Sequence, residues 1–117
     1  MTQEKTNRKH EWDVAATGVI QGIVAAEHKL TVFDMLARSR HAELVLPRQI
    51  AMSIAREKTT MSFPDLAKAF APSTTDHGTV MWACTQLQRK RVQKKSFNAA
   101  YELLAAKCAE AIGTFQR

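Results

Sequence analysis

Apolar residues return at steps of three or four along most of the chain, and this spacing constrains the fold more than any other feature. The clearest case is the C-terminal stripe of Phe97, Tyr101, Leu104, Cys108, Ala111 or Ile112, and Phe115. Such spacing places side chains on one face of an α-helix, whereas a half-buried strand needs strict alternation, which no segment of the sequence shows. The sequence therefore predicts an all-α fold.

About six helices are expected, and local signals mark several of their ends. Pro47 suits the first turn of a helix, because its missing N–H costs nothing there. Ser62 and Asp65 have the spacing of a capping box, with Pro64 in the first turn, and Asp76 (or Thr75) can cap the helix that follows. The expected helices cover 13–29, 31–38, about 46–59, 63–70, a segment starting near Asp76, and the C-terminal stripe.

The length of 117 residues and the hydrophobic content of 45% suit one domain with its own core. Residues 1–12 are charged and unpatterned, so we expect a flexible N-terminal arm there and the helical domain over 13–117. The net charge of +6 favours polyanionic partners. A basic solvated surface without a ligand would give the same charge balance.

Several classes of protein fit the sequence poorly. Cys84 and Cys108 lie within apolar helical patterns and without a neighbouring ligand, so we expect two free thiols and no metal site. The four histidines lie in separate segments, and no catalytic spacing or phosphate-binding loop is present, so no enzyme, no ATPase activity and no cofactor are expected. The apolar stretch 14–26 is too short to span a membrane, and the polar opening residues favour a cytoplasmic location.

The helix over 63–70, a short loop and the helix near Asp76 have the outline of a helix-turn-helix. Asp76, His77 and Thr79 would project from the positive end of the second helix, where side chains can meet base edges and backbone amides can meet phosphate. This arrangement would allow the helix to read double-stranded DNA, although a lone Asp-His pair by itself fits an ordinary helix cap better. An ordinary exposed helix cap beside a surface histidine is the alternative.

Over residues 20–104 the chain resembles the C-terminal duplex-binding domain of DnaA, the bacterial chromosomal replication initiator. Two motifs carry most of the resemblance, Pro47-Arg48-Gln49 followed by Ala51-Met52, and Asp76-His77 followed by Thr79-Val80. The other matching residues are Ile20, Gln21, Lys29, Val32, Asp34, Leu36, Ala55, Pro64, Phe70, Ala83 and Cys84.

The resemblance implies an extended helix-turn-helix of the Trp-repressor-like type and a short, asymmetric A·T-rich DNA site. Arg40 would enter the minor groove, Arg48 and Gln49 would hold phosphate, 63–64 would approach a thymine methyl or the backbone, and 76–79 would lie in the major groove. The implied DNA-binding residues are Arg38, Arg40, Arg48, Gln49, Phe63, Pro64, Asp76, His77, Gly78 and Thr79.

Three features depart from the family pattern. Gly78 replaces a threonine, so base preference should change at this point. The loop over 71–75 is two residues longer than usual and lacks an arginine, which should alter how the next helix meets DNA. Ala42, Glu43 and Leu46 make the basic loop less cationic, so affinity should be lower.

A second hypothesis is a protein-interaction module that keeps the fold but has lost base reading. In that case the C-terminal helix would dock a partner or a second copy of the chain, and burial of its apolar stripe would argue against this. The sequence fits either an excised domain or a stand-alone protein that regulates replication or transcription. In both cases DNA would be bound without ATP hydrolysis.

Overall fold

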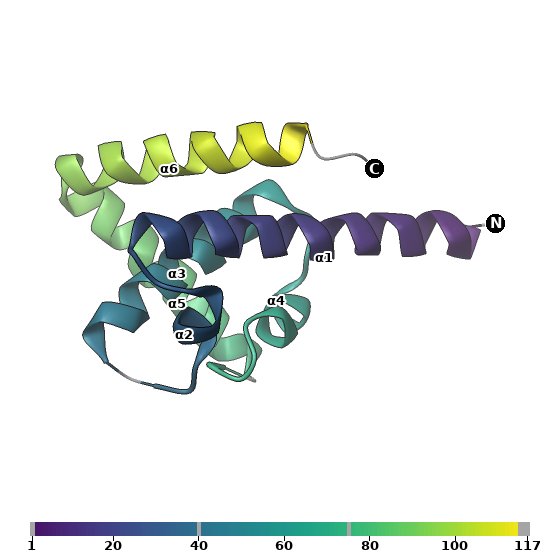
Figure 1. Cartoon of the computed structure of the whole chain (residues 1–117), viewed down its shortest axis with the longest axis horizontal. Helices are drawn as coiled ribbons and strands as arrows, with labels where there is room; N and C mark the ends of the chain where they lie inside the picture. Colours follow the sequence, from purple (N-terminus) through teal and green to yellow (C-terminus); the bar gives the residue numbers. More distant parts are fainter. Residues whose placement is uncertain (1, 40, 75, 115–117) are drawn as a thin grey trace.

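The computed structural model describes residues 2–39, 41–74 and 76–114, and within these residues it contains six α-helices and no strand. The all-α prediction is therefore confirmed. The helices are α1 Thr2–Glu27, α2 Val32–Leu36, α3 Ala42–Lys58, α4 Phe63–Ala69, α5 His77–Gln93 and α6 Lys95–Gly113 (Figure 1). None of them combines the length and apolar character that crossing a membrane requires.

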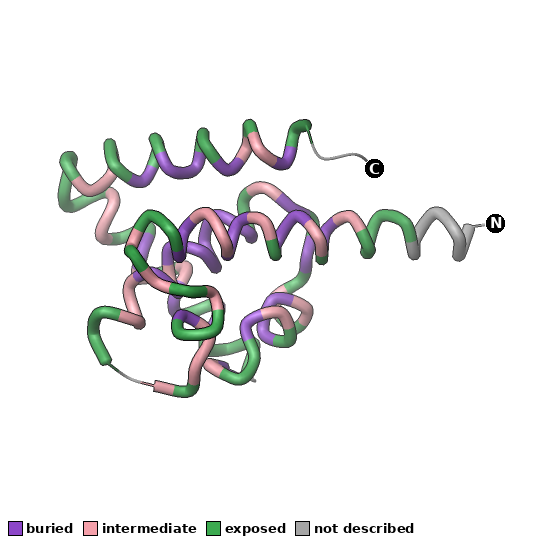
Figure 2. The backbone as a smooth tube through the Cα atoms, in the orientation of Figure 1, coloured by how far each residue is buried: buried purple, intermediate pink, exposed green. Residues whose placement is uncertain are grey.

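Two long helices, α1 and α6, lie against each other and run in opposite directions along the upper side of the molecule in Figure 1. Helix α3 packs beneath them, and it also contacts α2, α4 and α5. Buried residues follow the inward sides of α1 and α6 (Figure 2). The largest fully buried side chains are Phe70, Ile20, Met35, Ile54, Leu66, Leu87, Val24 and Val80.

Helix α1 begins at Thr2, which corrects the predicted start at residue 13. The added segment contains no glycine or proline and is rich in Glu, Lys and Gln, which have high helix propensity. Once Ala16 and Ile20 are anchored in the core, each further residue extends an existing helix and needs no new nucleus. The flexible arm over 1–12 stays a prediction, which amide hydrogen exchange would test.

Helix α3 also begins earlier than predicted, at Ala42, so Pro47 lies inside the helix and not in its first turn. The turn ahead of the proline is closed by the backbone N–H groups of Leu44 and Val45, which donate to the carbonyl of His41 at 2.9 and 3.1 Å. Pro47 therefore removes one bond from a turn that already has others. The predicted basic loop is shorter as a result.

The caps predicted for the next two helices are confirmed. Ser62 accepts a hydrogen bond from the backbone N–H of Asp65 at 3.2 Å and starts α4, with Pro64 in the first turn. Asp76 is the N-cap of α5. Val80 and Leu87 point into the core as predicted. Ala83 takes the third inward position, and Cys84 is half-buried.

Candidate nucleic-acid interface

The start of α5 is held in place by two polar side chains. One carboxylate oxygen of Asp76 accepts a hydrogen bond from the backbone N–H of Gly78 at 3.1 Å. The hydroxyl of Thr74 donates to the carbonyl of Asp76 and accepts from its N–H, both at 3.2 Å. Thr74 is only 7% exposed, whereas the four residues from Asp76 to Thr79 are all exposed. Hydrogen bonds within the chain therefore hold the start of α5 in place, while its side chains stay accessible to a ligand.

A cleft of about 710 Å³ lies beside the start of α5. The end of α2 and the start of α5 both lie on the lower side of the molecule in Figure 1, away from α1 and α6. The cleft brings together three residues that the resemblance implicates in DNA binding: Arg38, Arg48 and Thr79. Its other lining residues are Ser39, Val45, Pro72, Ser73 and Thr74.

Arg48 is hydrogen-bonded to the backbone at the C-terminal end of α2. Its Nε donates to the carbonyl of Met35 at 2.6 Å and one Nη donates to the carbonyl of Ala37 at 2.8 Å. The residue is 7% exposed, and burial lowers the pKa of the guanidinium from its ordinary value. No ion pair among the described residues includes Arg48. A largely desolvated cation thus borders the cleft without a carboxylate partner, and an anion there would be stabilised.

The other residues predicted to bind DNA from the basic loop and α3 differ in exposure. Arg38 is exposed and Gln49 is half-buried. Arg40 lies outside the described residues, so its predicted minor-groove position stays a prediction. Loop residues Ser73 and Thr74 were not predicted to contribute. The signal for Thr74 was local, because a hydroxyl two residues before an N-cap can order the turn.

Phe63 and Pro64 begin α4 and do not line the cleft. The guanidinium of Arg56 lies 4.1 Å from the centre of the Phe63 ring, and its Nη1 donates to the carbonyl of Met61 at 2.8 Å. One face of the ring is therefore covered by a cation, while Pro64 is exposed. Of the two, Pro64 is the better placed to meet another molecule.

The basic end of α5 lies at the opposite end of the helix from Asp76. Arg91 there is engaged with other side chains: it donates to Asn98 at 2.7 Å, and its guanidinium lies 4.1 Å from the centre of the Tyr101 ring. Lys90 lies over the ring of Phe97 at 5.1 Å. These two cations join α5 to α6, so part of the basic cluster has a role in the fold.

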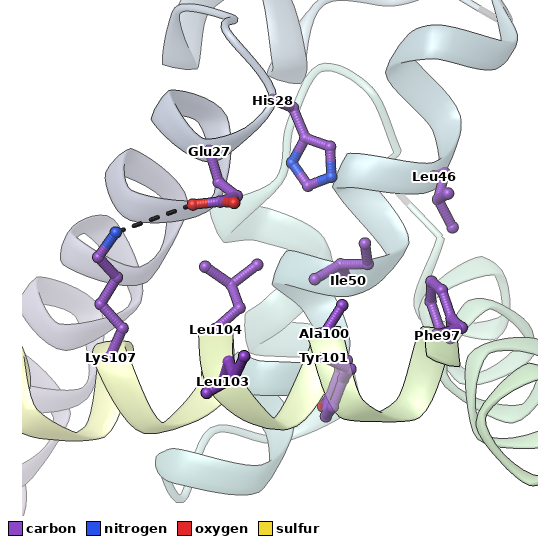
Figure 3. Close-up of a pocket in the computed structure, with 10 residues that line it drawn as sticks. All are labelled: Glu27, His28, Leu46, Ile50, Phe97, Ala100, Tyr101, Leu103, Leu104 and Lys107. Carbon is purple, nitrogen blue, oxygen red and sulfur yellow. Dashed lines mark ion pairs between the residues drawn. The ribbon is translucent and has the colours of Figure 1, made fainter. Parts of the chain in front are cut away.

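The apolar stripe of α6 is largely core. Tyr101, Leu104 and Cys108 are buried, as is Ile112, whereas Phe115 lies outside the described residues. The start of the stripe also lines a groove of about 430 Å³ between α1, α3 and α6, where Phe97, Tyr101 and Leu104 lie near Leu103 (Figure 3). Most of the stripe is therefore covered within the monomer, and the groove is the part of it left open to a partner.

Neither of the two cysteines pairs with the other, and Cys84 is half-buried while Cys108 is buried. Within the described ranges, no group of three or more His, Cys, Asp and Glu side chains is arranged to hold a metal ion.

The sequence around this site matches a known protein family. Residues 18–87, more than half of the chain, match the family model described as the bacterial dnaA protein helix-turn-helix. The chain belongs to this DnaA helix-turn-helix family. The matched stretch runs from the middle of α1 into α5 and leaves α6 outside it. The resemblance inferred from the two sequence motifs is thus confirmed.

Similar proteins include chromosomal replication initiator proteins DnaA from two bacteria. The chain is 36% identical to the protein of Psychromonas ingrahamii over 85 residues, 73% of this chain and 18% of that protein. It is 40% identical to the protein of Francisella tularensis subsp. novicida over 88 residues, 75% of this chain and 18% of that protein. The chain therefore spans less than a fifth of the length of these DnaA relatives.

The fold is also similar to a crystal structure described as a DNA replication initiation factor. The TM-score is 0.82 at 26% identity, and the match covers 93% of this chain and 33% of that chain. This coverage extends beyond the DnaA family match, so the similarity in fold includes most of α6.

Proposed function

We propose that this chain binds double-stranded DNA in a sequence-specific manner, with the N-terminal end of α5 in the major groove. The observation that carries the proposal is the exposed, internally capped start of α5 beside a cleft with Arg38 and Arg48. The positive end of the helix dipole adds to the charge of these side chains, so negative phosphate is favoured along this side of the molecule.

Phosphate contacts would set the position of the protein on the duplex, and α5 would read the bases. Arg38 and Gln49 supply exposed and half-buried donors, and Arg48 has three N–H groups beyond the two that bind carbonyls. Arg40 would reach the adjacent minor groove. Asp76, with residues 77–79, would face base edges in the major groove.

The wider role follows from the relatives, which are named chromosomal replication initiator proteins. We propose that this chain contributes DNA binding to the control of replication initiation or transcription in the cytoplasm. The sequence contains no phosphate-binding loop, so the proposed role involves no ATP hydrolysis by these 117 residues.

The test is selection of preferred duplexes from a random pool, followed by binding of the selected site and of a shuffled duplex at several salt concentrations. His77→Ala should weaken binding to the selected site by about 1–3 kcal/mol and bring it close to the shuffled duplex. His10→Ala is the matched control, because His10 is exposed on α1, away from the cleft. Equal binding of both duplexes by the wild-type protein would refute sequence-specific reading.

The second candidate is docking of a protein partner or a second copy in the groove beside α6. What supports it is the exposed Leu103, which is 75% accessible, together with the apolar residues Leu46, Ile50 and Phe97. Leu103→Lys would then abolish self-association or partner binding, while DNA binding would be unchanged. Sedimentation of both proteins at increasing concentration distinguishes the two cases for a second copy.

A further inference from the structure

The outward face of α5 carries two large apolar side chains that the core does not use. Trp82 is 59% exposed and Met81 is 45% exposed, whereas Val80, Ala83 and Leu87 on the opposite face are buried. At 100° per residue, Gly78, Met81 and Trp82 share one side of the helix, which continues through the exposed Thr85 and Arg89. The apolar pair therefore lies one turn after the proposed start of DNA reading.

We propose that Trp82, assisted by Met81, reads a thymine by contact with its C5-methyl group in the major groove. This inference rests on the proposed function, since it assumes that α5 enters that groove. The thymine methyl is the apolar group among the base-edge features there, while the other groups are hydrogen-bond donors or acceptors. The indole of Trp82 has one hydrogen-bond donor, its N–H, and no acceptor. The rest of its surface can contact a base only through apolar groups.

Gly78 fits this arrangement. Helical side chains lean toward the N-terminus, so Trp82 covers the turn that contains Gly78, four residues earlier. The nearest atoms to a Cβ built on Gly78 belong to the side chain of Asp76, at 3.4 Å or more, so the fold itself does not demand glycine here. The missing side chain leaves room between the helix and the bases, and Trp82 is the neighbour able to fill it.

DNA is favoured over a protein partner by what surrounds the pair. His77 and Thr79 flank Gly78 at the start of the same helix, and Thr79 lines the cleft with Arg38 and Arg48. An apolar contact one turn from a helix N-terminus, on a helix whose start borders a cationic cleft, suits a methylated base edge with phosphates nearby. A protein partner would need both an apolar site for Trp82 and acidic groups for Arg38 and Arg48.

The experiment compares the selected duplex with versions in which each thymine is replaced by uracil, which lacks the C5-methyl group. For the wild-type protein, one replacement should weaken binding about fourfold, the effect of removing one buried methyl. At that thymine, Trp82→Ala should bind the thymine and uracil versions equally, whereas any uracil effect at a thymine contacted by residues 63–64 should persist. It should bind random duplex as the wild type does. Trp82→Phe should restore part of the discrimination. Val92→Ala is the control, because Val92 is an exposed apolar residue at the far end of α5.

Each outcome separates this inference from the function on which it rests. If the wild-type protein does not distinguish the selected duplex from a shuffled one, the proposed function fails. If it does distinguish them but Trp82→Ala keeps the fourfold effect, the inference alone is overturned. The inference is likewise overturned if Trp82→Ala weakens all duplexes alike, or if it changes only the oligomeric state in sedimentation.

Discussion

Replacement of Arg48 by methionine tests whether this buried cation orders the cleft. The substitution keeps much of the apolar stem but removes the donors that bind the carbonyls of Met35 and Ala37 at 2.6 and 2.8 Å. A hydrogen bond from a charged group contributes about 1.5–3 kcal/mol, and part of this is offset because a desolvated charge is also removed. We therefore expect a net loss of about 2–3 kcal/mol in the free energy of unfolding.

For a domain of this size, that loss lowers Tm by about 8–12 °C, which thermal unfolding followed by circular dichroism would measure. Arg38→Met is the matched control, since Arg38 is an exposed cation on the same cleft. It should change the unfolding free energy by less than about 0.5 kcal/mol.

DNA binding adds a second readout. If Arg38 contacts one phosphate, Arg38→Met should reduce the slope of log K against log salt by about 0.9 without a change in stability. Arg48→Met should reduce both the slope and the stability. An Arg48→Met protein with unchanged Tm would refute the reasoning, because the two carbonyl bonds would then contribute nothing to the order of the cleft.

Three further predictions concern the cap, the core and alkaline stability. Asp76→Ala should cost about 1 kcal/mol of stability, whereas Asp76→Asn should keep the cap and change base preference, measured by repeating the duplex selection. Phe70→Ala should cost about 3–5 kcal/mol in urea unfolding, whereas Phe33→Ala, on a side chain that is 83% exposed, should cost little. Burial raises the pKa of Cys108 to about 11 from 9.0, so the stability it contributes below pH 9 is lost as pH rises toward 11. Cys108→Ala should remove about 1–2 kcal/mol of that loss, and an identical pH dependence in both proteins would contradict this.

The parts of the fold that local chemistry determines could be predicted from the sequence. Ser62 and Asp76 are caps because a short oxygen-bearing side chain precedes a helical pattern, and the structure has both hydrogen bonds. The buried face of α6 could be predicted as well, since the three- and four-residue spacing of its apolar side chains identifies that face. The two motifs at Pro47 and Asp76 were sufficient to identify the family.

The features that depend on tertiary contacts could not be predicted in this way. Pro47 was expected to begin a helix, but α3 has an additional turn ahead of it, which the bonds to the carbonyl of His41 close and the packing of Leu46 against the core stabilises. Nothing local indicates that Arg48 is buried, because its partners are carbonyls 11 and 13 residues earlier in the chain. The exposure of Trp82 could have been found by asking which large apolar residues fall on the polar side of α5.

The central claim is that DNA meets the start of α5 and the adjacent cleft. The most direct measurement is the change in backbone amide NMR shifts when the selected duplex is added to the isotopically labelled protein. The largest changes should fall on residues 76–82 and on Arg38 and Ser39, with little change along α6. Changes concentrated on α6 and on the groove around Leu103, with none at the start of α5, would contradict the account.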